Sequence, residues 1–99
     1  MKTILNKITA KVWVYPGMAG WHFVTIEKED GEELKRQYFL PRRGFGSIPV
    51  WVSIGKTRWK TSVFPEKEKT FLLPLKKAVR DAEAIHEGDT IKLTIEVIS

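Results

Sequence analysis

The residues best suited to bind a ligand are a tryptophan and three cations near the middle of the chain. In the segment VWVSIGKTRWKTSV, two runs of alternating residues flank the dipeptide Gly55-Lys56. Glycine at the first position of a two-residue loop favours a type II′ hairpin turn. This turn places Trp51 opposite Lys60 and beside Arg58, with Lys56 at the tip. An indole interleaved with cations can bind single-stranded nucleic acid by base stacking and phosphate contact.

Two other uses of this hairpin face fit the same residues. Trp51 and Lys60 could form a cross-strand cation–π pair, which is worth about 0.5–1 kcal/mol at an exposed site. Alternatively, a helix of the chain, a second copy in a homodimer or an unknown protein partner covers the indole, because tryptophan is enriched at interfaces. We expect a paired or covered surface first, nucleic acid or another acidic ligand second, and a small ligand third.

A second candidate site is the pair Arg42 and Arg43, within PRRGFGSIPV. The glycines permit positive φ angles, but strand-forming residues follow them. Phosphate-binding loops instead open a helix, whose N–H groups bind the anion. We therefore predict a structural turn with Phe45 turned inward, and contact of the two guanidinium groups with an anion is the alternative.

Residue types that perform catalysis are present without the arrangement that catalysis requires. Ser62 or Thr61 would need a base such as His22, itself held in place by a third group. No strained strand-to-helix elbow surrounds either hydroxyl. The carboxylates between residues 27 and 33 fall at a strand exit and a helix start, where solvation and the helix dipole account for them. We predict a non-catalytic protein, with a small hydrolase as the alternative.

Composition narrows the remaining possibilities. The sequence has no cysteine, and its two histidines lie far apart without carboxylates at ligand spacing, so we expect neither a metal nor another cofactor. The net charge of +5 falls within the roughly 2–8 charges that keep a small domain soluble, so only the placement of the charges bears on a partner. No apolar run reaches the length of a signal-peptide core or a membrane span, which predicts a cytoplasmic protein.

The elements that position these residues form a single predicted domain over residues 1–99. Alternating or β-branched runs predict six strands, at 8–15, 21–28, 48–54, 57–64, 70–75 and 90–97. Two short helices are predicted at 32–39 and 76–84, and we expect Gly31 to delay the first and Pro41 to end it. Such a chain is mainly β and indicates a small closed or half-closed barrel, because a flat six-stranded sheet could not cover both of its faces.

The hairpin register and the alternation also assign the interior of the barrel. Along a half-buried strand every second residue faces inward, and those residues are apolar. We expect the core to contain Ile8, Ala10, Val12, Val14, Ile48, Val50, Val52, Ile54, Trp59, Val63, Ile91, Leu93, Ile95 and Val97. From the second helix we expect Ala78, Val79, Ala82 and Ile85 to face the sheet.

The motifs RRGFGS, TSVFP, LP and VR…GD, together with a GWHFV-like second strand, resemble a prokaryotic family known only as domain of unknown function 1905. The resemblance covers about residues 8–97. It implies a compact β-barrel of the double-split type and transfers no activity, cofactor or catalytic residue. A shorter stretch, VRDAEAIHEGDTIKL, resembles the close of swapped-hairpin AbrB-like DNA-binding domains at Arg80, Ile85, Gly88 and Asp89. This second resemblance supports the fold, and DNA binding would rest on analogy.

Overall fold

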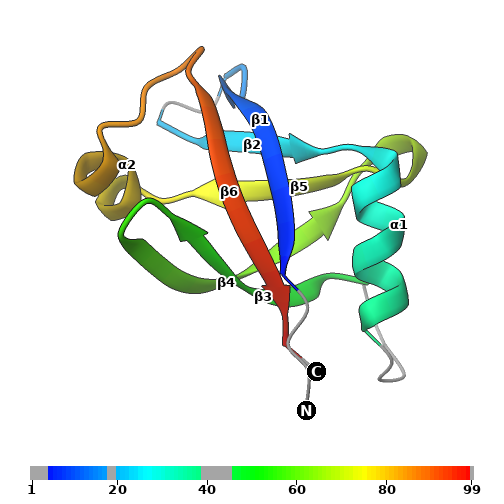
Figure 1. The fold of residues 1–99 in the computed structure, drawn as a ribbon. Coiled ribbons are helices and arrows are strands. Elements are labelled where there is room, and N and C mark those ends of the chain that lie inside the picture. The colour runs from blue at the N-terminus through cyan, green and yellow to red at the C-terminus, as the bar shows by residue number, and fades with distance from the viewer. Residues whose placement is uncertain (1–4, 18–19, 39–45, 99) are drawn as a thin grey trace.

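The computed structural model describes residues 5–17, 20–38 and 46–98 as a closed barrel of antiparallel strands with two α-helices (Figure 1). The strands are β1 (Asn6–Val14), β2 (His22–Ile26), β3 (Ile48–Ile54), β4 (Thr57–Pro65), β5 (Phe71–Leu75) and β6 (Thr90–Val97), and the helices are α1 (Lys28–Gln37), the 3-10 helix η1 (Lys67–Lys69) and α2 (Lys77–Glu83). Around the barrel the strands follow the order β1-β2-β5-β4-β3-β6. The predicted fold class is therefore confirmed.

Two half-sheets that share β1 and β4 make up the barrel. The first part of β1, residues 6–11, pairs with β6, whereas residues 12–14 pair with β2. In the same way, residues 57–63 of β4 pair with β3, and only Phe64 and Pro65 pair with β5. Each shared strand thus divides between two partners, as expected for a double-split barrel. The half-sheets β1-β6-β3-β4 and β1-β2-β5-β4 diverge between β1 and β2 and between β4 and β5.

The central hairpin β3–β4 has the register that the sequence predicts. Ile54 pairs with Thr57, and the pairing continues without interruption to Ile48 and Val63. Gly55 has a φ of +56°, while Lys56 is not among the residues with positive φ. A single positive φ at the first loop residue is the type II′ turn rather than type I′. The hairpin residues predicted to be interior are all buried: Ile48, Val50, Val52, Ile54, Trp59 and Val63.

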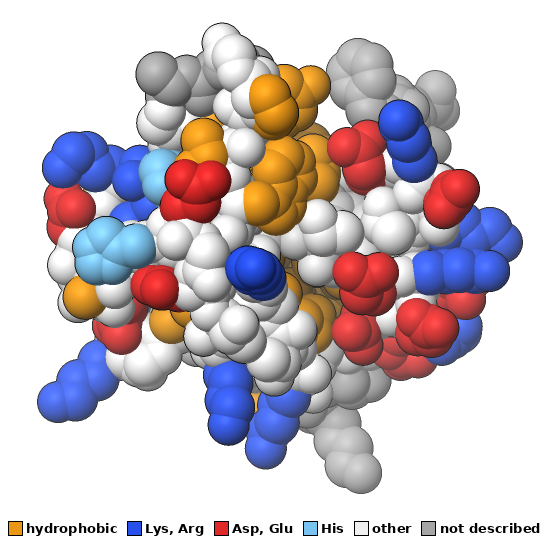
Figure 2. All heavy atoms as spheres, turned by 90° about the horizontal axis from the view of Figure 1, so that it is seen from above, with side chains coloured by type: hydrophobic (Ala, Val, Ile, Leu, Met, Phe, Trp, Pro, Cys, Tyr) orange, Lys and Arg blue, Asp and Glu red, His pale blue; other side chains and the backbone are white. Residues whose placement is uncertain are grey.

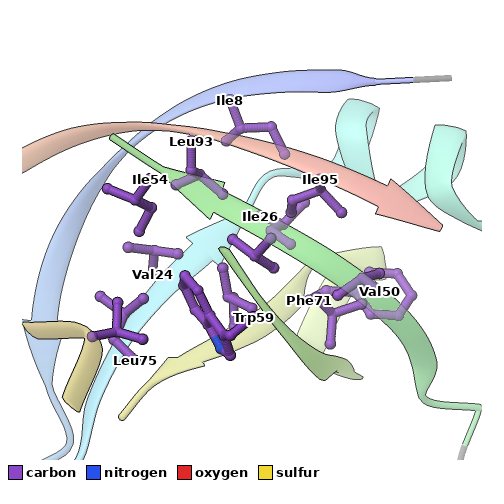
Figure 3. Close-up of a cluster of buried hydrophobic side chains, with 14 of the residues drawn as sticks. Ile8, Val24, Ile26, Val50, Ile54, Trp59, Phe71, Leu75, Leu93 and Ile95 are labelled. Atoms are coloured by element: carbon purple, nitrogen blue, oxygen red, sulfur yellow. The ribbon is translucent and has the colours of Figure 1, made fainter. Parts of the chain in front are cut away.

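Apolar side chains from all six strands and both α-helices fill the barrel (Figure 3). Burying one Val, Leu or Ile side chain stabilises a fold by about 1.5–3 kcal/mol, so this cluster is the main source of stability. Ala10, Ile91 and Val97 pack against the cluster but are only partly buried. Val14, also predicted to be in the core, is only partly buried and is not part of the cluster. The prediction for α2 was half wrong, because Ala78 and Ala82 are exposed whereas Val79 and Ile85 are buried.

Helix α1 begins at Lys28, so the prediction that Gly31 delays its start to residue 32 was wrong. Gly31 lies inside α1 and is buried where the helix crosses η1. A Cβ atom at this position would lie 2.8 Å from the carbonyl oxygen of Lys69 and 2.9 Å from a ring carbon of Phe71. Glycine therefore permits the close approach of two segments, whereas its low helix propensity alone suggested a helix boundary.

Candidate functional site

The indole predicted to be the working residue of the central hairpin is covered by an arginine of the same hairpin. Trp51 is partly buried, and Cζ of Arg58 lies 4.2 Å from the centre of its ring. Arg58 Nη2 also lies 3.3 Å from Oε1 of Glu96 on β6, the residue that pairs with Trp51. The cation–π pair therefore exists, but the prediction of Lys60 as its partner was wrong. The longer arginine reaches the diagonal neighbour, where Glu96 holds it.

The hairpin cations belong to a wider surface, the outer side of the half-sheet β1-β6-β3-β4. The register aligns Lys7, Thr94, Ser53 and Arg58 in one row across the four strands. The next row along β1 and β6 pairs Thr9 with Lys92, and a further one pairs Lys11 with Thr90. We call this surface the basic face, and its charged residues are Lys7, Lys11, Lys56, Arg58, Lys60, Lys92 and Glu96.

Most charges of the basic face are not neutralised by neighbouring side chains. Of its six cations, only Arg58 takes part in an ion pair among the residues that the structure describes. Most carboxylates of the described residues lie elsewhere, although Glu83 lies beside Gly55 at the hairpin tip and Glu87 lines a cavity with Lys11. Those between residues 27 and 33 lie at the start of α1 and along it, and Figure 2 shows acidic side chains crowded on the side of α1. The basic face therefore has a strong local excess of positive charge.

The other predicted site, Arg42 and Arg43, lies outside the described residues, as do Pro41 and Phe45. The choice between a structural turn and an anion contact stays a prediction. The described part of this segment begins at Gly46. Its φ is +77°, which is the positive φ that the sequence analysis expected a glycine of this turn to adopt.

An aromatic cluster that the sequence analysis did not identify covers the outer side of the β1–β2 hairpin. The ring centroid of Phe23 lies 5.4 Å from that of Trp13 and 6.1 Å from those of Tyr15 and Trp21. Trp21 is 52% exposed and Tyr15 is 41% exposed. Figure 2 shows exposed hydrophobic side chains gathered at this end of the barrel. The outward positions of Trp13 and Tyr15 were predicted, but their convergence on Phe23 depends on a register that the loop sequence does not fix.

A groove of about 340 Å³ opens where β4 and β5 diverge. Their pairing is limited to Phe64 with Leu72 and Pro65 with Phe71, and the next outward residue of β5, Pro74, has no N–H group with which to extend the ladder. Helix α2 and the end of the β1–β2 loop border the opening. We call it the β4–β5 groove, and the side chains that matter below are Trp21, Trp59, Lys60, Pro74, Lys76, Lys77 and Arg80.

The second divergence, between β1 and β2, opens into a larger cavity of about 610 Å³. Its charged lining residues are Glu27, Asp30, Glu87 and Lys11. The two openings of the barrel therefore differ in sign, since carboxylates dominate this one and cations dominate the β4–β5 groove.

The candidate catalytic groups do not form a hydrogen-bonded pair in the described part of the chain. His22 Nδ1 lies 2.9 Å from the carbonyl oxygen of Gly20. Thr61 and His22 both line the β4–β5 groove, but no hydrogen bond joins His22 to Thr61 or to Ser62. Within residues 5–17, 20–38 and 46–98, no group of three or more His, Asp or Glu side chains could hold a metal ion.

Fold and surfaces together define a small double-split β-barrel with one basic outer face and one aromatic outer face. The family model named "Domain of unknown function (DUF1905)" matches residues 9–95. Because this match covers most of the chain, the protein belongs to that family, and the predicted resemblance is confirmed. No curated protein matches the sequence. Among the described residues, no helix combines the length and the apolar character that a membrane crossing requires.

Proposed function

We propose that this chain is a non-catalytic binding module whose basic face binds single-stranded nucleic acid in the cytoplasm. One observation mainly supports this proposal. Five of the six cations on the basic face have no ion-pair partner among the described residues, and the face has a single carboxylate, Glu96. A surface with such an excess of charge attracts a polyanion, and binding releases the counterions of the phosphates.

The arrangement of the other side chains on this face also suits a flexible strand. The guanidinium of Arg58 lies over Trp51, and a base can stack on the outer side of this guanidinium plane. Hydroxyl groups of Thr9, Ser53 and Thr94 lie in the same rows as the lysines, where they can donate hydrogen bonds to phosphate oxygens.

The test is the salt dependence of binding to an oligothymidylate, measured by fluorescence anisotropy. If four of the cations each neutralise one phosphate, the slope of log K against log salt is about −2.8, because each phosphate of a single strand contributes about −0.7. Affinity should then fall about fiftyfold between about 50 and 200 mM salt. A slope near zero, or no binding at the lower salt concentration, would refute the proposal.

Variants locate the binding surface. Replacing Lys7 and Lys92 together with glutamine should make the slope less steep by about 1.4. The matched control replaces Lys35 and Lys67, which are exposed lysines on α1 and η1, and should leave the slope unchanged. Equal effects of the two double variants would show that the attraction is not specific to the basic face. Equally tight binding of a duplex would remove the argument from base stacking.

A second candidate function is association with another protein chain through the aromatic cluster. Trp21, Tyr15 and, farther along the same half-sheet, Phe64 are 52%, 41% and 46% exposed, and aromatic residues are enriched at interfaces. This surface replaces Trp51 as the expected contact, because Arg58 already covers that indole. A second copy is the simplest partner. A concentration-dependent mass in sedimentation, abolished by Trp21→Ala, supports it, whereas a strict monomer speaks against it.

A further inference from the structure

We infer that the β4–β5 groove binds a small ligand with a flat ring and a carboxylate or phosphate group. The site is distinct from the basic face except for Lys60, which lies between the two surfaces. The inference therefore does not depend on nucleic-acid binding.

The groove exists because a strand ladder stops early. Continuing the register of Phe64 with Leu72 would pair Thr61 with Leu75, but the observed pairing ends at Leu72. Beyond this point β4 pairs only with β3 and β5 only with β2. The separation brings inward-facing residues to the floor of the groove, since Trp59 and Thr61 line it together with Leu75, although only 7% of Trp59 and 2% of Leu75 is exposed.

Flat apolar groups border the groove on two sides. On the outer side, Trp21 stacks against Phe23 with an interplanar angle of 29°, yet 52% of it stays exposed. Pro74 is the register partner of Phe23 and lines the groove beside Trp21. On the inner side is Trp59, and Figure 3 shows its nitrogen at the end of the ring that points away from Val24. Aromatic rings and proline present the flat contact surfaces against which a planar ligand packs.

The charge of the groove selects an anion. Among the residues that the structure describes, its charged lining residues are the cations Lys60, Lys76, Lys77 and Arg80, and no carboxylate is among them. Lys77 also forms an ion pair over 2.8 Å with Asp81, which does not line the groove. By contrast, the cavity between β1 and β2 is lined by three carboxylates. The β4–β5 groove and the cavity between β1 and β2 thus offer opposite charges to a ligand.

Arg80 is held in place for such a contact. Its Nε donates to the carbonyl oxygen of Leu75 over 3.1 Å, and its Nη2 donates to that of Gly20 over 3.3 Å. Both acceptors are backbone oxygens of residues that line the groove. A guanidinium group has five N–H donors, so three remain for a ligand. A cation whose side chain is already ordered loses little conformational entropy when an anion binds.

The volume limits the size of the ligand. At about 340 Å³, the groove is near the lower end of the roughly 300–1,000 Å³ that small-molecule sites occupy. A single ring system with one anionic group fits this space. Aromatic acids and nucleotide-like phosphates share that chemistry, and the experiment separates them.

The experiment titrates ¹⁵N-labelled protein with benzoate and with phenyl phosphate and follows the indole N–H signals of Trp59 and Trp21 by NMR. Benzamide tests the ring without a charge, and acetate and inorganic phosphate test the charge without a ring. We expect saturable chemical-shift changes with benzoate, phenyl phosphate or both at millimolar concentration. The apparent affinity for each of the three controls should be at least fivefold weaker. Which probe binds identifies the source of the ligand. No saturable shift with either, or equal affinity for benzamide, overturns the inference.

Variants assign the binding to the groove. Replacing Lys76 and Lys77 with glutamine should weaken binding about fivefold, since each exposed cation contributes modestly, and Trp21→Ala should weaken it by at least as much. The double replacement of Lys35 and Lys67 is the charge-matched control and should have no effect. Lys7→Gln with Lys92→Gln should reduce oligonucleotide binding only, so failure of the proposed function and of this inference are distinguishable. Full affinity in both groove variants refutes the assignment.

Discussion

Replacing Gly31 with alanine tests the contact that positions α1 on the barrel. Helix propensity alone predicts that this change stabilises the protein by about 1 kcal/mol. The structure predicts the opposite, because the new Cβ would lie 2.8 Å from the carbonyl oxygen of Lys69 and 2.9 Å from Phe71. The oxygen cannot withdraw easily, since Lys69 and its neighbour Glu68 already have φ angles of 68° and 55°.

The expected magnitude follows from these two opposing effects. Overpacking costs about 1–3 kcal/mol, and a clash with backbone belongs in the upper part of that range. After subtraction of the propensity term, Gly31→Ala should lower the free energy of unfolding by about 1–2 kcal/mol. Urea unfolding followed by tryptophan fluorescence measures this change. Lys35→Ala, at an exposed position of the same helix, should stay within about 0.5 kcal/mol. A Gly31→Ala protein more stable than the parent would refute the argument.

Two further predictions concern polar contacts of the helices. Thr57 Oγ1 donates to Oε2 of Glu83 over 2.6 Å, and this hydrogen bond links α2 to the hairpin. Thr57→Val should therefore lower the free energy of unfolding by about 1 kcal/mol. An unchanged thermal midpoint would contradict this. Hydrogen bonds from Gln37 and then Arg36 lower the pKa of Glu33 below its ordinary value of 4.5. Its stabilising effect is therefore present above that value and is lost as the pH falls through the lowered pKa, so Glu33→Gln should flatten the acid end of the stability profile. An NMR titration of Glu33 at or above 4.5 would contradict it.

What the sequence predicted well was local. The register of the central hairpin was predicted correctly residue by residue. The two-residue loop Gly55-Lys56 fixes which residues pair, and the alternation of apolar and polar residues in both strands agrees with that pairing. The overall barrel followed from the number of strands in a short chain. The family resemblance then supplied the double-split arrangement, which no local pattern indicates.

What it missed depends on contacts between distant segments. The role of Gly31 is set by Lys69 and Phe71, almost forty residues later in the chain. The aromatic cluster needs the pairing of Trp13 with Phe23 across the loop PGMAG, whose proline and glycines predict a turn but do not fix the register. Likewise, the β4–β5 groove exists only because the barrel closes imperfectly. Each of these features belongs to the assembled barrel and to no single element.

The same closure constrains how the protein can be made. Asn6 pairs with Ile95, so residues 6–11 of β1 meet β6 only after almost ninety further residues have been synthesised. At about 5–20 residues per second, this part of β1 waits several seconds for its partner, whereas residues 12–14 can pair with β2 much earlier. Topologies dominated by such distant pairings fold slowly. A nascent chain that lacks β6 leaves β1 and β3 without the strand that joins them, and such unpaired edges are open to aggregation.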